Sequence, residues 1–202
     1  MLYVRTGHLK APFRRDFSTT SGDDGLQFWQ QRIGLTRAQA ETVRLRLRAR
    51  DATSLEGNQA AKAVETSELL QQRLELSDAE LKNMIITMPQ FLGYSYEDNI
   101  VPSLEKLQQR LELSHAELRK MIITQPQILG YSYVDNIVPS LENIQQRLEL
   151  SDAALKKMVV TQPSILGCSY EDNIVPSLEN LQQRLELSDA ELKKMMVKMP
   201  SI

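Results

Sequence analysis

Apolar side chains recur at intervals of three and four residues through most of this chain, a spacing typical of helices that bury one face. One block shows it in Ile137, Leu141, Ile144 and Leu148. Residues 132–148 are therefore expected to form an amphipathic helix that ends at a turn around Glu149. Ser132 and Asp135 resemble a capping box at its start. Pro139 lies early in this helix, where a proline is tolerated or introduces a kink.

A second helix is expected from Ser151, which stands in the N-cap position of a capping arrangement. Its apolar stripe consists of Leu155, Met158 and Val159. Pro163 ends the helix, because an interior proline costs about 3 kcal/mol. A short apolar turn follows, and Gly167 is expected there with left-handed backbone. The block thus predicts helix, turn, helix, proline and short apolar turn.

The same block recurs with a pitch of 37 residues. The period is fixed by Pro89, Pro126, Pro163 and Pro200, and equally by Leu74, Leu111, Leu148 and Leu185. The stretch WQQRIGLT at residues 29–36 matches LQQRLELS in the later copies, which gives five units with the first degenerate and the last incomplete. One helix pair cannot bury its own apolar stripe, so this pitch predicts an all-α, right- or left-handed solenoid of stacked helix pairs.

Leucines seven residues apart permit a second interpretation, a leucine zipper. One such run is Leu104, Leu111 and Leu118. The turn at residues 112–113 interrupts this run before the three or four heptads that a coiled coil requires. The leucines are therefore expected to form the core of the solenoid.

The composition argues against several classes of function. The 202 residues include four Phe and one Trp, and no apolar run approaches the length of a membrane span. Cys168 is the single cysteine, and His8 and His115 are the only histidines. We therefore expect no internal disulfide, metal site, cofactor, membrane association or small-molecule substrate. No repeated acid, base and nucleophile set indicates an enzyme.

The formal net charge of −2 conceals an asymmetry. Residues 1–50 hold ten Lys or Arg and four acids, so the remaining 152 residues carry a formal charge of −8. Nucleic-acid-binding proteins usually present a basic patch. The charge of the repeats therefore counts against nucleic-acid binding unless the cations gather on one face.

Residues 1–22 are expected to be a mitochondrial transit peptide. They contain Arg and Lys but no acid before Asp16, and hydroxyl residues cluster at 18–21. Cleavage is expected near residues 17–21, and a disordered basic tail is the alternative. Residues 26–57 are then the degenerate first repeat and residues 58–202 the remaining repeats. The expected location is the mitochondrial matrix, with the chloroplast as the alternative.

The string LELSDAALKKMVVTQPSILGCSYEDNIVPSLENLQQRLELS resembles the mitochondrial transcription termination factor (mTERF) family. The shared features are the serine-capped second helix, the proline, the apolar turn ending in Leu-Gly and the leucines seven apart. The resemblance covers residues 51–202 and extends weakly to Leu26. It implies a curved helical solenoid in an organelle that binds double-stranded DNA, sometimes RNA, and controls transcription or its termination without catalysis. One departure is that the family's Gly before Leu-Ser, kept at Gly34, is replaced by Glu75, Glu112, Glu149 and Glu186.

Two rows of cations recur with the pitch and are candidate phosphate contacts. The first consists of Lys82, Arg119, Lys156 and Lys193, followed one position later by Lys120, Lys157 and Lys194. Its alternative role is solvated surface, with an aspartate four residues earlier pairing within the helix. The second row consists of Arg32, Arg73, Arg110, Arg147 and Arg184. Its alternative role is to complement the negative end of a helix dipole.

The first repeat adds a dense basic cluster. Its members are Arg44, Arg46, Arg48 and Arg50. From these features we expect a protein that binds double-stranded DNA or RNA, with organellar transcription proteins as further partners. The competing hypothesis is an acidic solenoid that serves as a protein scaffold. The tyrosines at the unit boundaries are expected to pack between repeats rather than to stack on bases.

Overall fold

The computed structural model describes residues 24–48 and 57–198, so the expected transit peptide at residues 1–22 lies outside the described part of the chain. These described residues form ten α-helices and no β-strand, which confirms the all-α solenoid. The helices pair in chain order into five units. Their bounds are α1 (Asp24–Ile33) and α2 (Arg37–Arg48) in unit 1, α3 (Gly57–Arg73) and α4 (Asp78–Thr87) in unit 2, α5 (Val101–Arg110) and α6 (His115–Thr124) in unit 3, α7 (Val138–Arg147) and α8 (Asp152–Thr161) in unit 4, and α9 (Val175–Arg184) and α10 (Asp189–Lys198) in unit 5.

Short helical segments connect the units. The 3-10 helices η1 (Pro89–Gly93), η3 (Pro126–Gly130) and η5 (Pro163–Gly167) follow α4, α6 and α8. Single π-turns, η2 (Tyr96–Ile100), η4 (Tyr133–Ile137) and η6 (Tyr170–Ile174), precede α5, α7 and α9. The helix expected over residues 132–148 therefore begins with a π-turn. Pro139, in the first turn of α7, has no N–H to continue an α-helical ladder there.

The second helix of each unit begins at a hydroxyl cap, as the sequence predicts. Ser77 Oγ accepts a hydrogen bond from Glu80 N, and Glu80 Oε2 accepts one from Ser77 N at 2.8 Å. The same box forms at Ser114. In the degenerate first unit Thr36 and Gln39 make both bonds, at 3.0 and 3.2 Å. These bonds satisfy N–H groups that the first turn of a helix otherwise leaves without partners.

The turn between the two helices of a unit passes through left-handed backbone. In unit 1 this position is Gly34, with φ of 66°. Glutamates with φ between 47° and 51° occupy it in the other units, namely Glu75, Glu112, Glu149 and Glu186. A residue with a Cβ pays roughly 1–2 kcal/mol for this conformation. The departure from the family's glycine is therefore a source of strain.

The glycines of the Leu-Gly pairs are needed for a different reason from the one expected. Among the described glycines only Gly34 has a positive φ. The prediction of left-handed backbone at Gly167 is therefore wrong. A Cβ on Gly130 would lie 2.8 Å from Met88 Cε and 2.9 Å from Tyr94 Oη, and one on Gly167 would overlap the Tyr131 hydroxyl. The tyrosine of one unit therefore packs on the glycine of the next.

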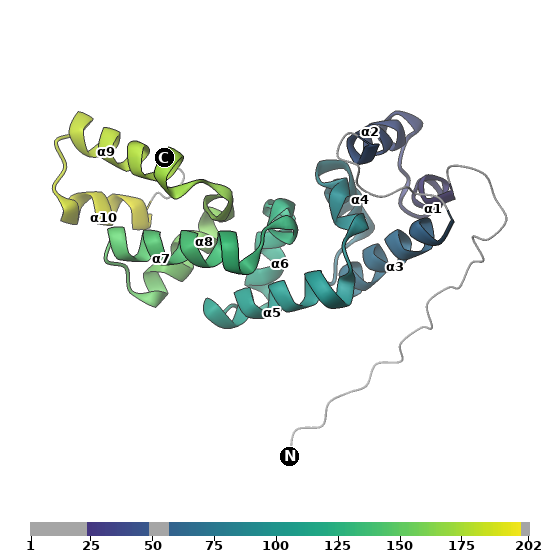
Figure 1. The fold of residues 1–202 in the computed structure, drawn as a ribbon, viewed down its shortest axis with the longest axis horizontal. Helices are drawn as coiled ribbons and strands as arrows, with labels where there is room; N and C mark the ends of the chain where they lie inside the picture. The colour runs from purple at the N-terminus through teal and green to yellow at the C-terminus, as the bar shows by residue number, and fades with distance from the viewer. Residues whose placement is uncertain (1–23, 49–56, 199–202) are drawn as a thin grey trace, which may run out of the picture.

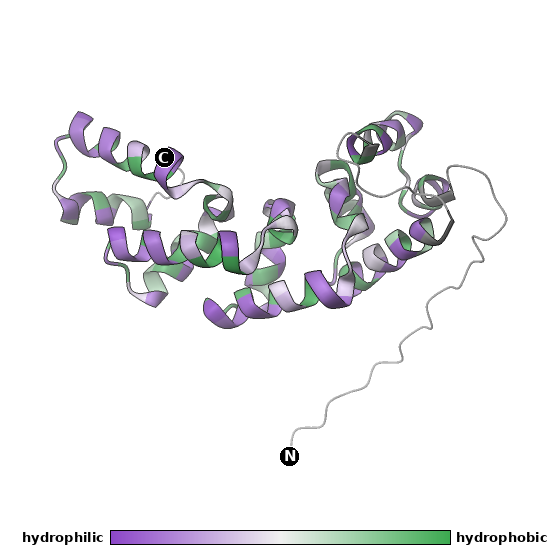
Figure 2. Cartoon of the chain, viewed as in Figure 1, coloured by the Kyte–Doolittle hydropathy of each residue, from purple (hydrophilic) through white to green (hydrophobic). Residues whose placement is uncertain are grey.

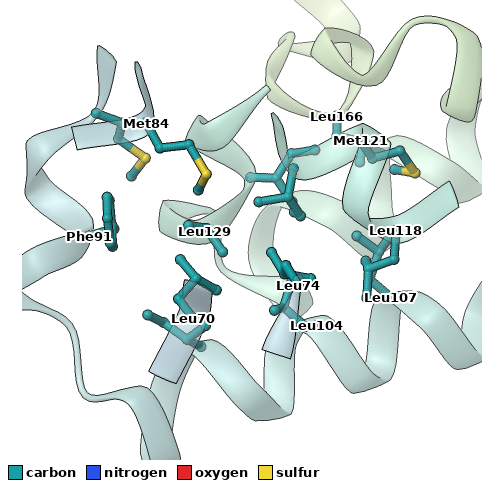
Figure 3. Close-up of a cluster of buried hydrophobic side chains, with 14 of the residues drawn as sticks. Leu70, Leu74, Met84, Phe91, Leu104, Leu107, Leu118, Met121, Leu129 and Leu166 are labelled. Atoms are coloured by element: carbon teal, nitrogen blue, oxygen red, sulfur yellow. The ribbon is translucent and has the colours of Figure 1, made fainter. Parts of the chain in front are cut away.

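One continuous apolar cluster runs through all five units. Figure 3 shows its middle part, with Met84, Phe91 and leucines from α3, α5 and α6 among the labelled buried side chains. The leucines seven residues apart lie in this cluster, and Leu111 and Leu148 are only 3% and 4% exposed. This confirms their role as solenoid core. Leu185, at the same position of the last unit, is 54% exposed.

The stack is curved and has two layers. Within one layer, α2 packs on α4, α6 on α8 and α8 on α10, and the 3-10 helices η1, η3 and η5 also pack on one another in turn. From α3 onward, the first helix of a unit instead packs on the π-turn of the next unit. Figure 1 shows α3 and α5 along the outer edge. We call the second helices and the 3-10 helices, which contact one another from unit to unit, the inner layer. Figure 2 shows that hydrophilic and hydrophobic residues alternate around the helices.

Candidate nucleic-acid interface

In units 1 to 4 the arginine of Gln-Gln-Arg contacts the following unit. The ion pairs join Arg32 to Asp78 at 2.7 Å, Arg110 to Asp152 at 3.4 Å and Arg147 to Asp189 at 3.5 Å. In each case the aspartate is the first residue of the next unit's second helix. The arginine row thus bridges stacked units, a role that spacing within one helix does not indicate.

A glutamine completes each of these contacts. Gln145 Oε1 accepts a hydrogen bond from Arg110 Nη2 at 2.8 Å, and Gln145 Nε2 donates to Asp152 Oδ1 at 2.9 Å. Gln182 makes the corresponding bonds at the next junction, at 3.3 and 2.9 Å. We call each set of arginine, glutamine and aspartate an arginine clasp. It explains why Gln-Gln-Arg and Ser-Asp recur together in the sequence.

The first row of cations forms a second set of contacts between units, which we call the lysine clasps. Its bonds run from Lys82 Nζ to Gly34 O at 2.6 Å, from Lys156 Nζ to Glu112 O at 2.8 Å and from Lys193 Nζ to Glu149 O at 2.6 Å. Each acceptor is the left-handed turn residue of the preceding unit. Arg119, in the same row, instead binds both carboxylate oxygens of Glu80 at 2.8 Å. Pairing of these lysines with the aspartate four residues earlier is not found in the described part of the chain.

The junction between units 2 and 3 departs from this scheme. His115 replaces the aspartate at the start of α6, and its exposed ring places Nε2 2.8 Å from Arg73 O. The Arg73 guanidinium lies 3.6 Å from Glu105 Oε1 instead. At this junction, the contact between the His115 ring and the Arg73 backbone carbonyl replaces the ion pair between arginine and aspartate.

The caps and clasps keep their carboxylates ionised. The hydrogen bond from its N-cap backbone N–H, followed by the bond from Lys156 Nζ, lowers the pKa of Glu117 to about 2. The hydrogen bond from Gln145, then that from Arg110, lowers the pKa of Asp152. Most cations of the two rows therefore face carboxylates or carbonyls of this protein rather than open solvent.

Three other candidate cations remain open to solvent. Lys120, Lys157 and Lys194 are exposed at the same position of α6, α8 and α10, and no hydrogen bond or ion pair of their side chains is found within the described residues. Hydrogen bonds from Ser188 and then the charge of Lys194 lower the pKa of Glu191, three residues before that lysine. Asn83 holds this position in α4. The exposed residues four before and four after the lysines are Ala116, Thr124, Ala153, Thr161, Ala190 and Lys198. We call the lysines and these flanking residues the lysine stripe.

Acidic residues are absent from the chain that surrounds this stripe. No Asp or Glu occurs in residues 81–96, 118–134 or 153–170. These intervals cover α4, α6 and α8 after their first turns, together with η1, η3 and η5. The acids of the repeats lie in the turns, the π-turns, the outer helices and the clasped first turns. The net negative charge is thus kept away from much of the inner layer, and the acid-free intervals are visible in the sequence.

A groove without acidic lining opens around the 3-10 helices η1 and η3. It has a volume of about 480 Å³ and spans units 1 to 3. It is lined by Arg46, Thr87, Met88, Gln90, Tyr94, Gln127, Gly130 and Tyr131. Hydroxyl, amide and guanidinium groups of this kind can donate hydrogen bonds to phosphate or sugar oxygens.

The basic cluster of the first repeat is partly used for docking. Arg46 Nη1 donates to Ile86 O at 2.6 Å and so holds α2 on the C-terminal end of α4. Arg44 pairs with Glu41 at 2.8 Å. The Arg48 side chain and Arg50 lie outside the described part of the structure. The two described members of the cluster, Arg44 and Arg46, therefore both make contacts within the protein.

No helix in residues 24–48 and 57–198 is long and apolar enough to cross a bilayer. The same residues contain no group of three His, Cys, Asp or Glu side chains arranged to hold a metal ion.

The family model mTERF matches residues 39–147, more than half of the chain, from within α2 to the end of α7. A search of curated proteins returns no match. The matched region contains two of the left-handed turns, two serine capping boxes and the acid-free intervals of units 2 and 3. The chain therefore belongs to the mTERF family, whose members are helical-repeat proteins that bind nucleic acids and are not typically enzymes.

Proposed function

We propose that this protein binds double-stranded DNA along the lysine stripe and thereby regulates transcription, or its termination, in an organelle. The observation that carries the proposal is the separation of charge. The stripe presents one lysine from each of units 3, 4 and 5, and the chain around it is free of acid for at least 16 residues in units 2 to 4. A polyanion can approach this layer without meeting the carboxylates that give the repeats their negative charge.

The clasps and the stripe have different tasks in this proposal. The clasps fix the distance between units, so that Lys120, Lys157 and Lys194 stand at even steps. Each lysine then neutralises a phosphate and releases condensed counterions, which supplies affinity that does not depend on base sequence. The threonines of the stripe and the amides of the groove add hydrogen bonds to the backbone that fix its position.

Binding of a labelled DNA duplex, measured by fluorescence anisotropy at several salt concentrations, tests this proposal. Three phosphate contacts predict that log K falls against log salt with a slope of about −3. A duplex RNA of the same sequence, measured in parallel, tells whether the backbone chemistry matters. Absence of binding at low salt, or a flat slope, would refute the electrostatic mechanism.

The organellar location rests on the composition of residues 1–22. The proposal is that they direct the protein to the mitochondrial matrix, or to the chloroplast in a plant. Fusion of residues 1–25 to a fluorescent protein, compared with a fusion in which Arg5, Arg14 and Arg15 are glutamine, tests it. Cytosolic fluorescence from the unaltered fusion would contradict targeting.

A protein scaffold is the second candidate, because acids line the outer helices and the turns. Proteins captured from organelles by this chain, with and without nuclease treatment, separate the two functions. Partners lost with nuclease support nucleic-acid binding. Partners retained after nuclease, together with no affinity for the duplex, support the scaffold.

A further inference from the structure

Within the described part of the chain, the junction between units 2 and 3 is the one that has neither kind of clasp. His115 stands where the other junctions have an aspartate that binds the arginine of the preceding unit. Arg119 stands at the position of the clasp lysines, but it binds the Glu80 carboxylate instead of the carbonyl of a left-handed turn. The contacts that fix the spacing of the other units are therefore replaced here.

The helices around this junction also pack less closely than their counterparts elsewhere. In the inner layer α2 packs on α4, α6 on α8 and α8 on α10, whereas α4 and α6 pack on one another less extensively. Figure 1 shows α4 and α6 standing apart. In unit 4 the π-turn η4 packs on η5, and the corresponding elements of unit 3, η2 and η3, pack on one another to a smaller extent. The stack is thus at its loosest where the clasps are missing.

Two cavities lie at the same junction. The groove of about 480 Å³ takes part of its lining from units 1 and 2, including Arg46 and Met88, and part from unit 3, including Gln127. A second cavity, of about 450 Å³, lies between the face of η2 and α5 and residues 129–134. Tyr94 and Gly130 line both cavities. Because protein interiors are otherwise closely packed, this space lets the neighbouring units change their angle without a steric clash.

The contacts that remain across the junction tolerate a rotation. The apolar cluster continues through it, and apolar contacts hold surfaces together without fixing a direction. The ion pairs of Arg119 with Glu80 and of Arg73 with Glu105 join long, partly exposed side chains, which can follow a movement of the backbone and contribute little rigidity. The junction is therefore held together but is free to turn.

We propose that the junction between units 2 and 3 is a hinge, released by the loss of both clasps, about which units 1 and 2 rotate as one body against units 3 to 5. The groove is lined by residues of both bodies, so the rotation opens and closes it. Lys120, Lys157 and Lys194 all lie on the second body, where the clasps keep their spacing unchanged. The proposal does not depend on nucleic-acid binding.

Distances between two spin labels, measured by double electron–electron resonance in a Cys168→Ser background, test the hinge. The pair Asn83→Cys and Lys157→Cys spans the hinge. The matched pair Lys120→Cys and Lys194→Cys occupies the same helix positions one unit later and spans clasped junctions only. The distance distribution of the first pair is expected to be about twofold wider than that of the second, because only the first reports the rotation. Equal widths would overturn the proposal.

Exchange of the clasp residues shows whether their loss releases the hinge. The variant His115→Asp/Arg119→Lys supplies the residues of the clasped junctions and is expected to narrow the first distribution to the width of the second. The reciprocal variant Asp152→His/Lys156→Arg is the matched control and is expected to widen the second distribution. A wide first distribution that His115→Asp/Arg119→Lys leaves unchanged also overturns the proposal. Circular dichroism checks that all variants keep the same helix content.

Discussion

Four glutamates hold left-handed backbone where unit 1 has a glycine. Nothing in the described contacts requires the carboxylates of Glu112 and Glu149, since the lysine clasps use only their backbone carbonyls. A glycine at these positions would therefore remove the backbone strain and keep the carbonyl that accepts the lysine clasp.

Replacement of Glu112 by glycine is expected to stabilise the protein by about 1 kcal/mol, because glycine adopts this φ without a Cβ clash. Urea denaturation measures the change. Glu112→Ala is the matched control, since alanine removes the same charge and retains the clash. Equal stabilisation by alanine would assign the effect to charge and would contradict the role of backbone strain.

At Gly130, the space available for a side chain, rather than the backbone angle, is what requires glycine. Gly130→Ala is expected to cost about 1–3 kcal/mol, since the new methyl group meets Met88 Cε and the Tyr94 hydroxyl. Adding Tyr94→Phe removes that oxygen and should recover part of the loss in thermal unfolding. Independent, additive effects of the two substitutions would show that the residues do not compete for this space.

Helix pairs are joined by two kinds of clasp, and both use residues that repeat with the pitch. The arginine clasp bridges α5 to α8 and α7 to α10, and the lysine clasp bridges a second helix to the preceding turn. Their contacts are partly exposed, with Arg110 32% and Asp152 82% exposed in their side chains. Each clasp therefore contributes less than burial of a leucine, and its main effect is to fix how units are spaced.

Arg110 and Arg184 provide a matched pair for testing the clasp, because they share one position and only Arg110 has a described partner. Arg110→Ala is expected to lower the midpoint of thermal unfolding by about 2 °C. Arg184→Ala should leave it unchanged. If both substitutions lower the midpoint equally, the arginine acts within its own helix and the clasp contributes nothing.

Acid is expected to weaken the junctions. A carboxylate whose pKa is lowered on folding stabilises the protein above its ordinary pKa, and the contribution is lost as the pH falls through the folded value. For Glu117 that window runs from the ordinary 4.5 down to about 2. Unfolding midpoints should therefore fall across it.

The variant Glu117→Gln measures how much this one carboxylate contributes to the pH dependence of stability. The variant should lose stability less steeply than the unaltered chain between the same limits, because one of the titrating groups is absent. An identical pH profile for the two proteins would show that the cap and Lys156 do not lower the pKa of Glu117 in solution.

The solenoid was predictable from the sequence to the extent that it depends on local signals. Periodic leucines, serine caps and prolines mark the helices, and the 37-residue pitch indicates that they stack. Partners distant in sequence were not predictable: Asp152 lies 42 residues from Arg110, and no local rule joins them. The same holds for Gly167, whose requirement comes from Tyr131 of the preceding unit.

The candidate interface was only partly visible in the sequence for the same reason. Both rows of cations could be identified from their spacing, yet spacing does not tell which cations the protein uses internally. Stacking turns the arginines and the first lysine row toward neighbouring units and leaves Lys120, Lys157 and Lys194 exposed. Comparison of acid-free intervals among the repeats points to the same face and needs only the sequence.

The most direct test replaces the stripe and measures the salt dependence of duplex DNA binding. The variant Lys120→Gln/Lys157→Gln/Lys194→Gln should reduce the slope of log K against log salt by about 2–3. Lys62→Gln/Lys106→Gln, on α3 and α5 of the outer layer, should leave that slope nearly unchanged. An equal loss in the two variants, or an unchanged slope in the first, would contradict binding through the lysine stripe.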